Sequence, residues 1–171
     1  MVSLINSIYD SFGSGVVIPG TGFALQNRGA GFTLTEGQAN TAAPGKRPFH
    51  TLVPAFVTRT TANGEEPWLS FGVMGGNMQP QGHLQVLLNL LIFGMDLQAA
   101  IDAPRFRHMS GLQVALESPV GDNVRQLLGN MGHRIIDERP VTFGGAQAVM
   151  RLERGWVAGS DPRKDGMAAG H

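Results

Sequence analysis

The chain contains no cysteine among its 171 residues. This absence excludes disulfide bonds, zinc sites with cysteine ligands and a thiol nucleophile. Charged residues are also few, at 15% of the sequence, and the 13 basic side chains equal the 13 acidic ones in number. Because there is no basic excess and no basic patch with interleaved aromatics, the sequence argues against a nucleic-acid partner and against attraction to an acidic membrane surface.

Long apolar segments are missing as well. The apolar run at 84–93 has about half the length of a membrane-spanning helix, so it predicts a buried helix and no membrane partner. Residues 1–6 have neither the basic flank nor the apolar core of a signal peptide, and the compartment stays undetermined. The length and the 42% hydrophobic fraction predict one globular domain over residues 1–171.

Histidines are present but do not form a ligand pattern. They are His50, His83, His108, His133 and His171. They are far apart in the sequence and lack the short spacing of metal ligands. The sequence also has no Gly-x-Ser-x-Gly elbow and no phosphate-binding P-loop. We therefore expect neither a metal nor another cofactor.

Apolar runs and turn residues predict an α+β chain. Strands are expected at 2–9, 16–18, 23–27, 51–58, 67–73, 112–117, 134–137, 147–153 and 156–160, and helices at 84–93, 96–102 and 119–131. The first three strands read as an antiparallel meander, and residues 28–48 read as a long loop. Because the helices follow the strands in groups rather than alternating with them, α+β layers are favoured over βαβ units.

The segment from Phe71 to His83 organises the rest of the chain. A strand-like run enters it and the apolar helical run leaves it, and the Gly75-Gly76 pair lies between them. Glycines leave backbone N–H groups open to a ligand, which is one way to build an anion or oxyanion site. A tight turn that only needs small residues explains the pattern equally well.

Two charged clusters follow this segment. The first runs from Arg105 to His108 and is interpreted as a solvated extended segment. The alternative is that it holds a carboxylate. The second contains Asp161 and Arg163, which we expect to pair and to hold a terminal loop.

Four segments occur together in an order that is typical of one family. They are Pro44-Gly45-Lys46-Arg47-Pro48 followed by Pro54, Gly75-Gly76, Ala100-Ile101-Asp102-Ala103-Pro104-Arg105-Phe106, and Gly159-Ser160-Asp161-Pro162-Arg163. With them the chain, from about residue 2 to residue 171, resembles the small, C-terminal subunit of gamma-glutamyltransferases (gamma-glutamyltranspeptidases).

The resemblance implies a fold and a mechanism. These proteins are N-terminal-nucleophile hydrolases with a four-layer α-β-β-α sandwich, of which this chain would supply an incomplete half. A precursor cuts itself, the new N-terminal threonine becomes the nucleophile, and its α-amino group serves as the base. The expected partners are the large subunit of the same precursor and a small gamma-glutamyl or related acyl amide substrate.

The resemblance also assigns site residues. Gly75 and Gly76 match the family's oxyanion glycines, and Ser7 stands at a threonine that helps to orient the nucleophile. Thr51 stands at the second of two serines that bind the substrate carboxylate, and His50 replaces the first.

Three positions depart from the family pattern. Tyr9 replaces an asparagine, Arg28 replaces a glutamine, and Gly31 replaces the aspartate that grips the substrate's α-amino group. Loss of that carboxylate removes the partner of a buried ammonium, which leaves gamma-glutamyl specificity open. The pattern is nearer to the glutaryl-cephalosporin acylase-like branch, in which Arg28 would meet an acidic or uncharged acyl group.

The resemblance places the nucleophilic threonine upstream of Met1, which reads as an internal methionine. We therefore expect the 171-residue chain alone to be inactive. A non-catalytic module that keeps the fold for binding or assembly is the alternative. A third interpretation is an unrelated α+β protein whose glycine loop binds phosphate.

Overall fold

A computed structural model describes residues 1–170 of the chain. They belong to two compact units: the first comprises Met1–Leu4 and Val53–His171, and the second comprises Ile5–Leu52. The expected single folding domain stays a prediction. No helix among residues 1–170 is long and apolar enough to cross a membrane.

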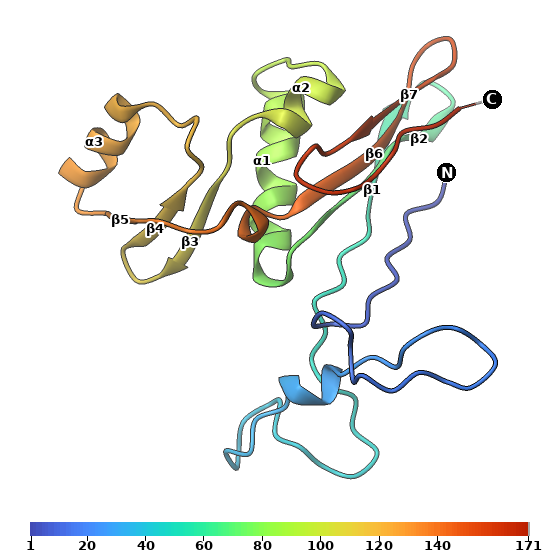
Figure 1. Ribbon diagram of the computed structural model, residues 1–171. Helices are drawn as coiled ribbons and strands as arrows, with labels where there is room; N and C mark the ends of the chain where they lie inside the picture. Colours follow the sequence, from blue (N-terminus) through green and yellow to red (C-terminus); the bar gives the residue numbers. More distant parts are fainter. Residues whose placement is uncertain (171) are drawn as a thin grey trace. The chain divides into compact units, whose positions relative to one another are not determined.

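A four-stranded antiparallel sheet is the centre of the first unit (Figure 1). Its strand order is β1-β2-β6-β7. The strands are β1 (Ala55–Thr61), β2 (Gly64–Met74), β6 (Gly145–Arg151) and β7 (Trp156–Ser160). Both hairpins are local: β1 turns into β2 around Asn63-Gly64, and β6 turns into β7 around Gly155. β2 is paired on both edges, with β1 and with β6.

Two helices pack on one face of this sheet, α1 (Gln79–Leu91) and α2 (Leu97–Asp102) (Figure 1). Between the layers lies a core that includes Leu69, Phe71, Val86 and Ile101, all of them buried. Because the residues of β2 from Trp68 to Phe71 are all buried, both of its faces are covered there.

The helix boundaries follow from local chemistry. The Asp96 side chain accepts a 2.9 Å hydrogen bond from the backbone N–H of Ala99, so the predicted N-cap of α2 is confirmed. α1 starts at Gln79, earlier than expected, because Pro80 in its first turn needs no hydrogen-bond partner for its nitrogen.

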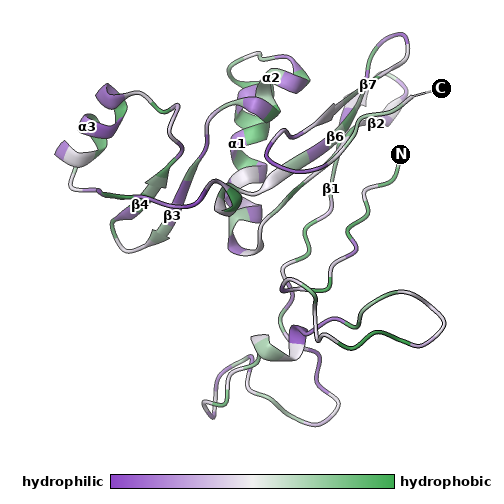
Figure 2. Ribbon diagram, in the orientation of Figure 1, coloured by the Kyte–Doolittle hydropathy of each residue, from purple (hydrophilic) through white to green (hydrophobic). Residues whose placement is uncertain are grey.

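A smaller three-stranded sheet and one helix complete the first unit. The strands are β3 (Phe106–Ser110), β4 (Gln113–Leu116) and β5 (Arg134–Ile136), and the helix is α3 (Asp122–Asn130). β3 and β4 are antiparallel, whereas β4 and β5 are parallel. α3 carries both polar and apolar residues and buries none of them (Figure 2). Grouped helices and mostly antiparallel strands confirm the α+β class.

The second unit has little regular structure. It contains the short 3₁₀ helix η1 (Arg28–Gly31) and isolated bridges between Val17 and Ala24 and between Thr33 and Thr41. The predicted long loop at 28–48 is therefore confirmed.

The strands predicted at 2–9, 16–18 and 23–27 are wrong, since 16–18 and 23–27 share only one bridge. Residues 2–9 join no ladder, although Ser70 Oγ donates to Val2 O and Ser3 Oγ donates to Phe71 O. Since both edges of β2 are already paired, Val2 and Ser3 reach it through side-chain hydrogen bonds alone.

Candidate functional site

The Gly75-Gly76 pair connects β2 to α1 through a single turn. Gly75 has φ 125° and ψ 31°, and Gly76 has φ 59°. Both values lie where a side chain is disfavoured, so glycine suits both positions. Gly76 opens the 3₁₀ helix η2 (Gly76–Met78), and α1 follows at once.

The two glycines differ in their surroundings. A Cβ atom on Gly75 would lie 3.0 Å from Gly144 Cα and 3.2 Å from Met78 Cβ, whereas one on Gly76 would meet nothing within 4 Å. The turn is therefore packed tightly at Gly75 and open at Gly76. Among the described residues, no loop or turn hydrogen bond takes the N–H of either glycine as its donor. These N–H groups are the kind of donor that an oxyanion requires.

The segment at 143–146 supports the turn from behind. A Cβ on Gly144 would lie 2.3 Å from Met74 O, so the backbones approach as closely as glycines allow. Arg105 Nη1 donates to Phe143 O at 3.1 Å. The N–H of Ala146 donates to Asp161 Oδ2 at 2.7 Å. Residues on both sides of Gly144 are thus fixed by two charged side chains.

These two side chains form a buried ion pair. Arg105 Nη2 lies 2.7 Å from Asp161 Oδ2, and the two residues are 2% and 1% exposed. Arg163 lies 3.1 Å from Asp161 and 2.6 Å from Glu117. The predicted pairing of Asp161 with Arg163 is confirmed. The expectation of a solvated piece is wrong for Arg105, because its guanidinium reaches a carboxylate that lies far along the sequence.

The surroundings of this network stabilise its charges. Burial by itself would raise the pKa of Asp161, but hydrogen bonds from the backbone N–H groups of Ala146 and Arg163, together with the Arg105 guanidinium, hold that pKa below its usual value. Burial alone would lower the pKa of Arg163, but its hydrogen bond to Glu117 and the charge of Asp161 raise it. Asp161 therefore stays ionised well into the acidic range.

A second group of candidate residues lies in the second unit, around Arg28. This residue is 8% exposed. Its Nη2 donates to Ser7 Oγ at 3.0 Å, its Nη1 donates to Thr51 Oγ1 at 3.5 Å, and its guanidinium carbon lies 5.3 Å from the centre of the Tyr9 ring. We call Arg28, Ser7, Thr51 and Tyr9 the Arg28 cluster. His50, beside Thr51, is exposed.

The structure thus brings three of the six candidate residues together, namely Ser7, Arg28 and Thr51. Gly75 and Gly76 form their own turn in the first unit. The support that Arg105 and Asp161 give to this turn is not predicted from the sequence. One signal could have indicated it. Arg105 lies between a predicted helix, which ends at Asp102, and an extended stretch, so its position is fixed on both sides.

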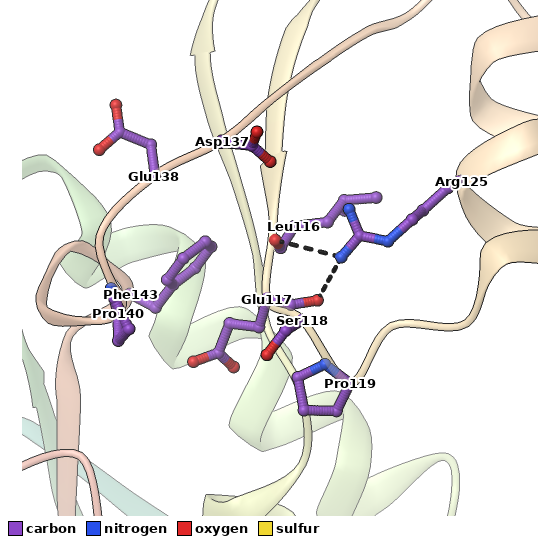
Figure 3. Close-up of a pocket in the computed structure, with 9 residues that line it drawn as sticks. All are labelled: Leu116, Glu117, Ser118, Pro119, Arg125, Asp137, Glu138, Pro140 and Phe143. Carbon is purple, nitrogen blue, oxygen red and sulfur yellow. Dashed lines mark hydrogen bonds between the residues drawn. The ribbon is translucent and has the colours of Figure 1, made fainter.

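The first unit also has a hollow of about 530 Å³ beside α3 (Figure 3). Arg125 crosses one side of it and donates to the backbone oxygens of Glu117, at 2.6 Å, and Leu116, at 3.4 Å. None of the candidate residues lines this hollow. Residues 1–170 contain no group of three or more potential metal-ligating side chains.

Comparisons with known proteins identify the family of the chain. Residues 1–171 match the family described as gamma-glutamyltranspeptidase. The glutathione hydrolase-like YwrD proenzyme of Bacillus subtilis is 38% identical over 99% of the chain. The chain spans 33% of that relative's length.

Two solved structures are also similar. The cephalosporin acylase of Bacillus halodurans is 43% identical with a TM-score of 0.84, over 96% of this chain and 31% of that one. The gamma-glutamyltranspeptidase of Pseudomonas nitroreducens is 28% identical with a TM-score of 0.86, over 99% of this chain and 93% of that one. The α+β fold is therefore that of the N-terminal-nucleophile hydrolases. The chain belongs to the gamma-glutamyltranspeptidase family.

Proposed function

We propose that this chain is the C-terminal part of an amidohydrolase or acyltransferase whose nucleophile is an N-terminal threonine outside the 171 residues. The names of its relatives support this reaction class, since they are a glutathione hydrolase-like proenzyme, a cephalosporin acylase and a gamma-glutamyltranspeptidase. The proposed partner is the large subunit of the same precursor, because the relative of B. subtilis is about three times as long as this chain and is a proenzyme.

The geometry of the Gly75-Gly76 turn carries the proposal. In acyl transfer the threonine oxygen attacks the amide carbon, and the carbonyl oxygen becomes negatively charged. Backbone N–H groups that are fixed before the reaction stabilise this charge without reorganisation. Gly75 and Gly76 have the positive φ values and the N–H groups without turn partners that this role requires.

The Arg28 cluster supplies the proposed substrate contacts. Ser7 Oγ accepts hydrogen bonds from Arg28 Nη2 and, at 3.1 Å, from the N–H of Tyr9. Because both bonds use its lone pairs, the Ser7 hydroxyl proton is available to orient a nucleophile or a substrate oxygen. Arg28, His50 and Thr51 would bind the substrate.

The proposed reaction has two steps. The threonine hydroxyl gives its proton to the α-amino base, its oxygen bonds to the acyl carbon, and the amine leaves with a proton. Water or an acceptor amine then attacks the acyl-enzyme, releases the acid or the new amide, and restores the threonine. Without the threonine neither step has a nucleophile, so the chain alone would be inactive.

Expression of the chain in one continuous reading frame with the upstream precursor segment tests this proposal. The expected result is self-cleavage into two chains, seen by mass spectrometry as a new N-terminal threonine, together with turnover of an acyl p-nitroanilide. A threonine-to-alanine variant of that position is the control and should abolish both. Turnover by the purified 171-residue chain alone would contradict the proposal. An assembled protein that neither cleaves itself nor turns over amides would favour a non-catalytic module.

A further inference from the structure

A second hollow of the first unit, of about 510 Å³, lies between α3 and the small sheet. Val114 and Leu116 of β4, both buried, line it on the side of the sheet. Val124 and Leu128 line it on the side of α3. It shares only Leu116 with the charged hollow of Figure 3. Its volume falls within the roughly 300–1,000 Å³ that is typical of small-molecule sites, and we call it the apolar hollow.

The helix beside the apolar hollow is incompletely packed. Val124 and Leu128 are four residues apart, so they lie on the same face of α3, and both line the hollow. An apolar face of this kind is normally buried against the next layer, but α3 buries none of its residues and Val124 is exposed. On the side of the sheet, Phe106 of β3 also lines the hollow and is also exposed. Apolar surface on both sides of the hollow is therefore available to a ligand, and its removal from water favours binding.

His133, which lines the apolar hollow, has a polar atom without a partner. Its Nδ1 is buried and makes no hydrogen bond within residues 1–170. An unsatisfied buried polar atom is uncommon in folded proteins. The other lining histidine uses its Nε2, since His108 Nε2 donates to Gly111 O at 2.9 Å. The remaining lining residues have apolar side chains, so a buried water molecule would find few of the two to four polar partners that it needs.

We propose that the apolar hollow is a binding site for a small phenol. The ring lies between β4 and α3, and the hydroxyl forms a hydrogen bond with His133 Nδ1. A hydroxyl both donates and accepts, so it matches Nδ1 whether or not that nitrogen carries a proton. A ring is favoured over a flexible chain because it buries a large apolar area with little loss of conformational entropy.

The lining of the apolar hollow also argues against charged ligands. An acid or an amine would bring a charge into a site whose lining contains no Asp, Glu, Lys or Arg. The site shares no residue with the Gly75-Gly76 turn or with the Arg28 cluster. The inference therefore requires no part of the proposed reaction.

An NMR titration of the 171-residue chain with 4-propylphenol and with propylbenzene tests the site, because these two molecules differ in one hydroxyl. We expect 4-propylphenol to bind with a dissociation constant of roughly 0.1–1 mM. It should bind about 3–10-fold more tightly than propylbenzene, which corresponds to one neutral hydrogen bond. The amide signals of Val114, Leu116 and Leu128 should shift with both ligands. The nitrogen-15 signal of His133 Nδ1 should shift further with 4-propylphenol, because only this ligand bonds to that atom.

Two variants separate the hydrogen bond from the apolar contacts. His133→Phe keeps a ring and removes Nδ1, so it should bind both ligands with equal affinity. Leu128→Trp places a larger side chain in the hollow and should abolish saturable binding of both ligands. Leu127→Trp is the matched control and should bind both ligands as the wild type does, because Leu127 is exposed and does not line the hollow. Circular dichroism checks that each variant is folded, and if His133→Phe is not, the nitrogen-15 shift of His133 in the wild type decides whether the hydrogen bond forms.

Three results would overturn the inference. The first is the absence of saturable binding below about 10 mM ligand, which would show that α3 closes onto the sheet. The second is equal affinity of the wild-type protein for 4-propylphenol and propylbenzene. The third is a set of amide shifts at exposed apolar residues outside the hollow, such as Ile92 and Phe93, which would indicate adsorption to the surface.

Discussion

Arg105 and Asp161 form an ion pair of 2.7 Å that is almost completely buried, and each residue also holds the backbone beside Gly144. Arg105 binds Phe143 O, and Asp161 binds the N–H of Ala146. Since Gly144 packs against Gly75, this pair connects the C-terminal segment to the proposed oxyanion turn. We therefore expect a change to this pair to affect both the stability of the protein and the position of the proposed oxyanion turn.

Removal of the Asp161 charge should destabilise the protein strongly. Asp161→Asn leaves Arg105 buried without its counter-charge, which typically costs about 3–5 kcal/mol. The exposed pair of Arg151 and Glu66, at 2.8 Å, provides a control, because Glu66→Gln should cost at most about 1 kcal/mol. Urea unfolding followed by circular dichroism measures both values. Similar losses of unfolding free energy for Asp161→Asn and Glu66→Gln would contradict the prediction that burial makes the Arg105–Asp161 pair more costly to break.

The stability contributed by Asp161 should depend on pH. Its pKa is lowered in the folded state, so the unfolded chain binds a proton first as the pH falls. The contribution is complete above the unfolded carboxylate pKa of about 3.9 and is lost as the pH falls through the lower folded value. The difference in unfolding free energy between wild type and Asp161→Asn should therefore be constant at neutral pH and shrink below about pH 4. A difference that shrinks near pH 7 would contradict this assignment.

The backbone at Gly144 should tolerate no side chain. Gly144→Ala places a Cβ 2.3 Å from Met74 O at φ 76° and ψ −161°, which adds a clash to the cost of about 1–3 kcal/mol for a backbone conformation that essentially only glycine adopts. Gly155→Ala, at φ 91° in open space, should show the backbone cost alone. In the assembled enzyme Gly144→Ala should also lower kcat more than it raises KM, because it displaces Gly75. Equal unfolding free energies for the two variants would refute the clash.

Local signals explain what the sequence predicts well in this fold. Asp96 caps α2 by accepting the N–H of Ala99, three residues ahead, and Arg154-Gly155 turns one strand into the next. The three early strands failed because a strand needs a partner edge, and an apolar run such as 16–18 does not reveal whether one exists. β2, the strand that Val2 and Ser3 approach, is paired on both edges at Ser70 and Phe71.

The site residues likewise differ between those defined by sequence neighbours and those defined by distant partners. The glycine turn could be read from adjacent residues, and Asp161 was paired with Arg163, two positions away. Its buried partner Arg105 is 56 positions away. The partners of Arg28 are 21 and 23 positions away. Contacts at such separations depend on how the chain packs, which residue spacing alone does not fix.

The contact between α1 and β2 offers a final prediction, at Gly82. An alanine there would favour the helix by about 1 kcal/mol, but its Cβ would lie 2.6 Å from Val73 Cγ1. Val73 is fully buried and its branched side chain has little freedom to move, so Gly82→Ala should destabilise the protein despite the better propensity. Val73→Ala alone should cost stability by leaving a cavity. In the double variant the new methyl group occupies part of that cavity, so the double-mutant cycle should show a favourable coupling of about 1 kcal/mol or more. Simple additivity of the two changes, measured by denaturant unfolding, would show that α1 shifts away from β2 rather than clashing with it.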